Sequence, residues 1–171
     1  MQTDQKIAGK LKKALVPALM LGFTVALLTF LLNLAEHVLI ISLGAKFLIF
    51  ASFGSSAFIM YMMPENDSAR VSKFVKSYIA AGLIGFLCTF LVPYIGLFYA
   101  IAVVETAIGI TLVGIGAKHP PAAAIGIVFL INRVGIYGIL IIIVGVATIS
   151  ILTTVLNKAF SEAEKEMKKI T

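Results

Sequence analysis

A histidine and two prolines interrupt the sequence between two apolar segments, at Lys118-His119-Pro120-Pro121-Ala122. Prolines cannot continue a preceding helix, but their fixed φ suits the first turn of a new one, so we predict a helix that begins near Pro120. Free N–H groups and the positive end of the helix dipole favour an anion at such a place, and Lys118 or His119 would add positive charge. The alternative is a break between helices at which His119 makes only local hydrogen bonds.

Two serines lie inside the second apolar segment. Ser55 and Ser56 follow a glycine, in the stretch Phe53-Gly54-Ser55-Ser56-Ala57. Hydroxyl groups in such a segment either line a polar path or bond back to the preceding helical turn and pack. Both interpretations remain open from the sequence.

A single carboxylate, Glu105, lies in the middle of another long apolar run. A charged group at membrane depth is costly and usually faces a cavity or a partner of opposite charge. Lys118, His119 and Arg133 are candidate partners for Glu105. The carboxylate is therefore either a proton-linked group or a structural counter-ion.

The composition defines the kind of element that must position these side chains. The chain has 171 residues, is 60% hydrophobic and only 13% charged, and has a mean hydropathy of +1.06. A soluble fold of this size would leave much of that apolar surface exposed, which excludes a soluble enzyme, a disordered chain and a secreted mini-protein. We therefore predict an all-α fold, a polytopic transmembrane helical bundle.

A membrane span needs about 20 apolar residues. Five runs are predicted as full spans: Ala14–Leu34, Phe47–Met63, Phe74–Val92, Tyr94–Gly116 and Val134–Asn157. A sixth segment, Pro120–Asn132, has 13 residues and is too short to cross unaided, so it is either a short span or a re-entrant half-helix. Pro17 is expected in the first turn of the first span, and Pro93 at a tight turn between the third and fourth.

The basic residues predict the orientation of the chain. If the short segment crosses, all lysines and arginines except Lys46 and Arg133 fall on one side, which should be the cytoplasm. Residues 1–13 are then a cytoplasmic basic tail, 14–157 a transmembrane domain of the cell membrane, and 158–171 a charged cytoplasmic tail. Anionic lipid explains the basic tails, and nothing requires a nucleic acid. If the short segment is re-entrant, there are five spans and the C-terminus lies outside.

Several kinds of chemistry lack a signal in the sequence. The chain has two histidines far apart in sequence and one cysteine, and it contains no phosphate-binding loop and no Ser-His-Asp arrangement on one element. We therefore expect no metal, no cofactor and no enzymatic activity. Recurring glycines in the spans, among them Gly82, Gly85, Gly109, Gly114, Gly116, Gly135, Gly138 and Gly145, are expected to let helices approach closely.

The motifs resemble those of the HPP family of integral membrane proteins. The stretch 116–124, with its His-Pro-Pro core, is similar to the signature that names the family, and residues 53–57 and 64–69 are similar to a second block. The loop departs from the family pattern, because Asn66-Asp67-Ser68 has no second proline. The resemblance covers about Phe47 to Asn157 and implies four membrane helices, fewer than the segments counted above. It also implies a link to nitrite, since some members are associated with nitrite transport.

These observations together predict a transporter or channel for a small inorganic anion, nitrite as first choice. The predicted binding residues are Lys118, His119, Pro120, Pro121, Ala122, Ser55, Ser56 and Glu105. The short chain offers little bulk for a gated pore, so a homo-oligomer is expected. The alternatives are a structural or accessory membrane subunit that does not transport, and a proton or cation pathway.

Overall fold

The computed structural model of the chain describes the backbone of residues 2–39 and 46–170, and side chains there except those of residues 2–6, 8, 35–39, 46–48, 50 and 168–170. Within these ranges the fold is all-helical, with no strand, which confirms the predicted class. The elements are α1 (Gln2–Leu39), α2 (Lys46–Met62), the short 3₁₀ helix η1 (Asp67–Ala69), α3 (Val71–Thr89), α4 (Val92–Gly114), α5 (Pro120–Asn132) and α6 (Gly135–Ile170).

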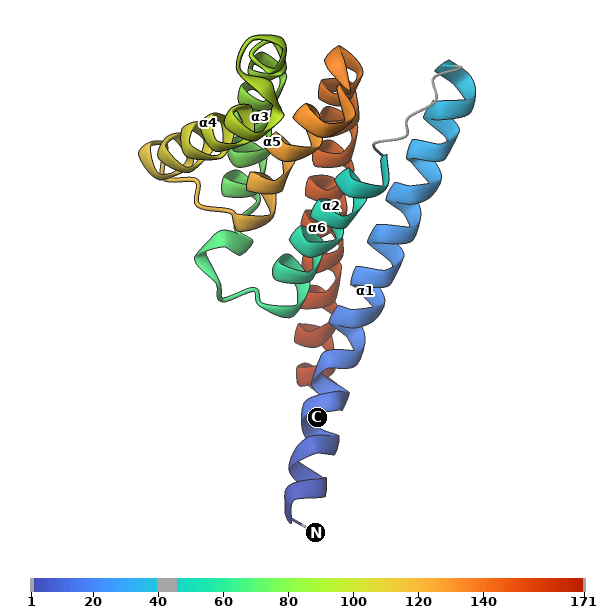
Figure 1. Ribbon diagram of the computed structural model, residues 1–171. Coiled ribbons are helices and arrows are strands. Elements are labelled where there is room, and N and C mark those ends of the chain that lie inside the picture. The colour runs from blue at the N-terminus through green and yellow to red at the C-terminus, as the bar shows by residue number, and fades with distance from the viewer. Residues whose placement is uncertain (1, 40–45, 171) are drawn as a thin grey trace.

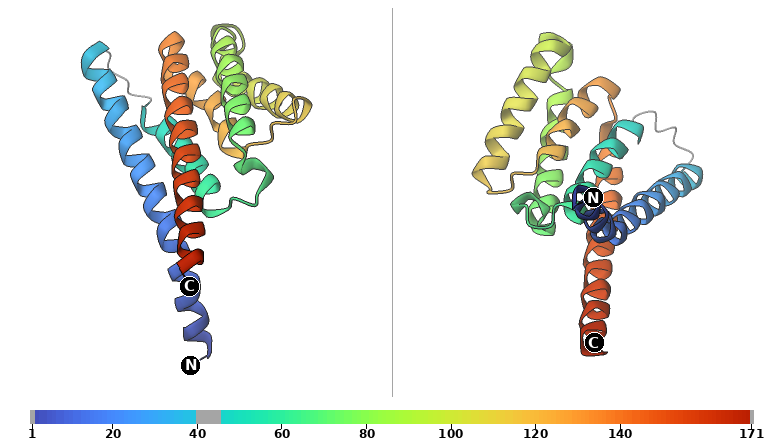
Figure 2. Two further views of the ribbon diagram at one scale, coloured as in Figure 1. Left: turned by 180° about the vertical axis from the view of Figure 1, so that it is seen from behind. Right: turned by 90° about the horizontal axis from the view of Figure 1, so that it is seen from below.

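Helices α1, α3 and α5 run in the direction opposite to α2 and α6, and α4 lies crosswise to them (Figures 1 and 2). The N- and C-terminal ends lie at the same end of the molecule (Figure 1). Helices α1 and α4 form opposite flanks, and α6 packs on α1, α2 and α3 between them (Figures 1 and 2). The short helix α5 packs on α2, α3 and α4. It runs in the direction opposite to α6 (Figure 1).

The predicted spans correspond to helices, but the count of five full spans is not reproduced. Four described helical stretches are long and apolar enough to cross a membrane: Gly9–Leu34, Val71–Thr89, Val92–Gly114 and Gly135–Met167. Helix α2 has 17 residues, roughly 25 Å of helix, and α5 has 13, roughly 20 Å. The bounds predicted for α5 are those observed, because two prolines fix its start.

Both terminal segments are helical over their described residues. Helix α1 already begins at Gln2, and α6 continues to Ile170, so both tails are helical extensions of the spans. Pro17 therefore lies inside α1 and not in its first turn. At this interior position it removes one backbone hydrogen bond of the helix. Pro93 also differs from the prediction of a turn, since it lies in the first turn of α4.

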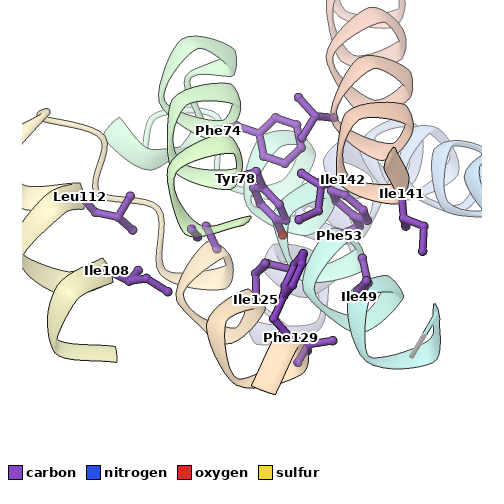
Figure 3. Packing of buried hydrophobic residues seen from close by; sticks show 14 of the residues in the cluster. Ile49, Phe53, Phe74, Tyr78, Ile108, Leu112, Ile125, Phe129, Ile141 and Ile142 are labelled. Atoms are coloured by element: carbon purple, nitrogen blue, oxygen red, sulfur yellow. The ribbon is translucent and has the colours of Figure 1, made fainter. Parts of the chain in front are cut away.

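The core lies where α2, α3, α5 and α6 meet (Figure 3). The Phe53 ring stacks on Tyr78 with centroids 4.8 Å apart and planes at 12°, and Phe74 packs against both. These three side chains are fully buried, as are Ile125 and Phe129 of α5. Lipid is as apolar as these residues, so close van der Waals packing between helices is what holds such a core together.

Glycines allow that packing at some of the predicted positions. A Cβ at Gly85 would lie 3.2 Å from the Cα of Gly126, so α3 and α5 approach backbone to backbone. Gly82, Gly138 and Gly145 also face side chains of neighbouring helices, which confirms their expected role. The expectation is wrong for Gly109, Gly114, Gly116 and Gly135, which have no atom within 4 Å of a built Cβ.

Helix α4 bends at Gly96, whose φ of 78° and ψ of 162° belong to a region that essentially only glycine adopts. Gly96→Ala should therefore lower the free energy of unfolding by about 1–2 kcal/mol, although no neighbouring atom would clash with the new Cβ. Unfolding in mixed detergent micelles measures the change. Gly109→Ala, in a regular and open part of α4, is the control, and equal stability of the two variants would contradict a strained bend.

Candidate functional site

His119 is the residue around which the candidate site is built. It is the N-cap of α5, in the connector from α4, and only 1% of it is exposed. Its Nδ1 lies 2.8 Å from the backbone oxygen of Ser68, and its Nε2 lies 2.7 Å from Oγ of Ser56. A carbonyl oxygen can only accept, so Nδ1 carries a proton and donates it to Ser68. His119 thus joins α2, η1 and α5.

The 64–70 loop presents the Ser68 carbonyl because Asn66 fixes its conformation. Asn66 is the N-cap of η1, and its Oδ1 accepts from the backbone N of Ser68 at 3.0 Å and from its Oγ at 2.7 Å. The loop lacks the second proline of the related pattern. A side-chain cap therefore gives this loop its turn.

Three buried hydroxyl groups extend the contacts of His119 toward α5. The Oγ of Ser56 lies 2.8 Å from the hydroxyl of Tyr78, which lies 2.6 Å from Oγ of Ser52. Ser52 in turn donates to the carbonyl oxygen of Pro121 at 2.5 Å. We refer to His119, Ser56, Tyr78, Ser52 and the Pro121 carbonyl as the hydroxyl chain. It begins and ends at the start of α5.

A groove lies beside the hydroxyl chain, between α2 and α5. Its volume is about 360 Å³, and its lining includes Ser52, Ser55 and Pro121 together with apolar side chains. Ser55 and Pro121 were both predicted as site residues and share this surface. The hydroxyl of Ser55 bonds back to the carbonyl of Ala51 at 3.0 Å, whereas Ser56 is fully buried and points to His119. The two serines therefore have different roles.

Comparison with known protein families agrees with the motifs at this site. The family model described as "HPP, transmembrane region" matches residues 7–166. The chain belongs to the HPP family of transmembrane proteins. The match includes most of α1, which the resemblance of residues 47–157 did not cover. No curated protein and no solved structure matched the sequence.

The start of α5 in this HPP-family chain differs from the anion site expected there. Pro120 and Pro121 have no N–H group, and the N–H of Ala122 donates to the carbonyl of His119 at 3.0 Å. The expectation of several free N–H donors at this helix start is therefore wrong for its first three residues. Polar groups at this point come instead from the side chains of the hydroxyl chain.

Positive charge gathers outside His119. Lys118 is exposed, and Arg70 and Lys73 both pair with Asp67, Arg70 through Nε at 3.3 Å from Oδ1. The hydrogen bond from Lys73 is the largest cause that lowers the pKa of Asp67, and the charges of Arg70 and Lys118 act in the same direction. Three cations around one carboxylate leave an excess of positive charge. We call Asp67, Arg70, Lys73 and Lys118 the cationic cluster.

Glu105 lies apart from the hydroxyl chain, on α4 against α5. A Cβ at Gly126 would lie 3.0 Å from its Oε1, and that oxygen is buried without a hydrogen-bond partner in the described part of the chain. His119 is not its partner, because both ring nitrogens bond to serines. Arg133 ends α5 in a left-handed conformation (φ 48°) and is exposed.

Sequence reasoning missed Ser52 and Tyr78. Ser52 lies four residues before Ser56 and hence on the same helical face, and this spacing was a usable signal. Tyr78 gave no such signal, since tyrosine is a common residue in apolar spans. No group of three or more histidine, cysteine, aspartate or glutamate side chains that could hold a metal ion is present among the residues described.

Proposed function

We propose that this HPP-family chain is a membrane transporter or channel for a small inorganic anion, with nitrite as first choice. The observation that carries the proposal is the juxtaposition of the cationic cluster with the buried polar site. Lys118 directly precedes His119, and Asp67 directly precedes Ser68, which His119 bonds. Excess positive charge at a mouth raises the local concentration of anions, and the hydroxyl chain supplies polar groups beneath it.

The groove between α2 and α5 is the proposed path. Ser52 and Ser55 supply hydroxyl groups on α2, and the start of α5 forms the other wall. The two hydroxyl hydrogens bond the carbonyls of Pro121 and Ala51, and a bound anion would share them. Two hydroxyl groups in an otherwise apolar groove suit a small, weakly hydrated anion better than a large or strongly hydrated one. The groove is open along one side, and in the proposed homo-oligomer a second copy covers it.

The proposed location is the cell membrane, with both chain ends in the cytoplasm. The basic residues of the two ends and of the cationic cluster would then face anionic lipid and the cytoplasm. In this orientation the cationic cluster is the cytoplasmic mouth of the path.

Flux measurements with purified protein in liposomes test the proposal. Wild-type protein should carry nitrite faster than empty liposomes do, with nitrate and formate as comparison anions. Lys118→Gln should lower nitrite flux about two- to fivefold at low ionic strength and less at high salt, because it removes charge from the mouth. Lys165→Gln removes an exposed lysine from α6 and is the matched control. Wild-type flux no greater than that of empty liposomes would refute transport.

A proton or cation pathway through Glu105 is the second candidate. The buried, unpartnered Oε1 of Glu105 supports it, since such a carboxyl group readily takes up a proton. Proton flux in the same liposomes without any anion, abolished by Glu105→Gln, is the result that would favour it over nitrite transport.

A further inference from the structure

The hydroxyl chain is short of protons when His119 is neutral. Four contacts link His119 Nε2, Ser56, Tyr78, Ser52 and the Pro121 carbonyl, at 2.7, 2.8, 2.6 and 2.5 Å. Each contact needs one hydrogen, and the three hydroxyl groups supply three. The proton on Nδ1 is already donated to Ser68. A neutral His119 therefore leaves one contact of the chain without a hydrogen.

An additional proton on Nε2 completes the chain. His119 would then donate to Ser56, Ser56 to Tyr78, and Tyr78 to Ser52. Ser52 would donate to the Pro121 carbonyl, which is the direction its bond already requires. The remaining contact, from Ser56 Oγ to the Ser52 carbonyl, is the longest at 3.1 Å and can be left unfilled or shared.

Protonation of His119 fixes the direction of every hydroxyl group in the chain. With an imidazolium, every O–H bond points away from His119, and the last one, on Ser52, donates to the carbonyl oxygen of Pro121. With a neutral ring whose Nε2 accepts from Ser56, one of the later contacts has no hydrogen, and Ser52 can then turn inward to Tyr78. Ser52 and Pro121 both line the groove, so an anion there can share the Ser52 hydrogen, and only a protonated His119 keeps that hydrogen directed at Pro121 in every arrangement.

We propose that His119 is a proton-binding site whose occupancy is coupled, through Ser56, Tyr78 and Ser52, to binding of a small anion in the groove between α2 and α5. The proposal rests on the proposed function and deepens it, because it makes a proton the ion that accompanies nitrite. By linkage, the proton and the anion each strengthen the binding of the other by the same factor.

The groups around His119 set the pH at which the site fills. Burial lowers the pKa of His119, and the hydrogen bond to Ser68 opposes this effect. The other titratable and charged groups near it are Tyr78 on α3, Glu65 in the 64–70 loop and the members of the cationic cluster. Residues 51–62 of α2 carry no charge. We therefore expect the site to be neutral at neutral pH and to fill on the acid side.

Nuclear magnetic resonance of labelled histidine tests the proton site in the full-length protein. The chain has two histidines, so His37→Asn in every sample leaves the signal of His119 alone. Over a titration from about pH 8 down to about pH 4, His119 should take up a proton at a pH below the ordinary range of a histidine side chain, because burial lowers its pKa. Ser52→Ala and Tyr78→Phe should weaken its proton affinity about tenfold, one pKa unit, because each removes two contacts but only one hydrogen, and so leaves enough hydrogens for a neutral ring.

Ser55→Ala is the matched control, since its hydroxyl bonds only to its own helix and lies outside the chain. It should leave the pKa of His119 unchanged. A His119 that stays neutral throughout the range, or an equal pKa in the Ser52→Ala and Ser55→Ala proteins, would overturn the proton site.

Nitrite itself then tests the coupling. Saturating nitrite should strengthen proton binding at His119 by about fivefold or more in the otherwise wild-type protein, and should have no effect after Ser52→Ala. If nitrite is transported but leaves the pKa of His119 unchanged, the coupling is overturned and the proposed function stands. If nitrite is not transported, the proposed function fails. The proton site is then still tested by whether Tyr78→Phe weakens the proton affinity of His119.

Discussion

His119→Ala should lower the free energy of unfolding by about 2–5 kcal/mol. The substitution removes two hydrogen bonds at once and leaves the Ser68 carbonyl without its donor, whereas the Ser56 hydroxyl keeps its contacts to Tyr78 and to the Ser52 carbonyl. An unsatisfied buried group costs roughly 1–3 kcal/mol, and the Ser68 bond also joins the 64–70 loop to the start of α5. Unfolding in mixed detergent micelles, followed by circular dichroism, measures the loss.

His119→Asn separates the two bonds. An asparagine amide can replace Nδ1 as the donor to Ser68 but does not reach Ser56, so about half of the loss should remain. An alanine variant as stable as the wild type would show that His119 does not tie α2, η1 and α5 together.

Gly145→Ala should destabilise the protein by about 1–3 kcal/mol, although it adds a single methyl group. The new Cβ would overlap the ring of Phe53, which is fully buried and stacked on Tyr78. The ring cannot move without displacing Tyr78, the middle hydroxyl of the chain. The effect should therefore appear in stability and also in the titration of His119.

Two further variants test this explanation. Gly109→Ala places the same methyl group where no atom lies within 4 Å and should leave the stability nearly unchanged. Combining Gly145→Ala with Phe53→Leu should cost less than the sum of the two single losses, because the smaller side chain makes room. Equal stability of the Gly145→Ala and Gly109→Ala proteins would contradict the close packing of α6 on α2.

Local chemistry explains which parts of the fold were predictable. The prolines at 120 and 121 fix the start of α5, and the polar residues Asn132 and Arg133 end its apolar run, so both bounds follow from the sequence. Helix α3 begins at Val71, three residues before the predicted span, because hydropathy marks the apolar stretch and not the polar first turn. The bend at Gly96 depends on a backbone conformation that the residue type permits but does not require.

The site was predictable only in its sequence-local part. His119 and Ser56 were both identified from motifs, but their contact joins residues 63 positions apart and depends on how α2 packs against α5. Tyr78 enters the chain because its ring is held between Phe53 and Phe74, which a linear pattern cannot reveal. The predicted pairing of Glu105 with His119 was wrong for the same reason. Spacing along the chain does not tell which face of α4 meets α5.

Nitrite uptake into liposomes containing wild-type or His119→Asn protein tests the central claim most directly, which is that an anion crosses the membrane at the site built around His119. Both proteins are reconstituted at equal amounts, after circular dichroism shows equal helix content, and uptake is measured at neutral pH. We predict uptake by the wild type well above that of empty liposomes and uptake by His119→Asn close to theirs. Equal uptake by the two proteins would contradict the account.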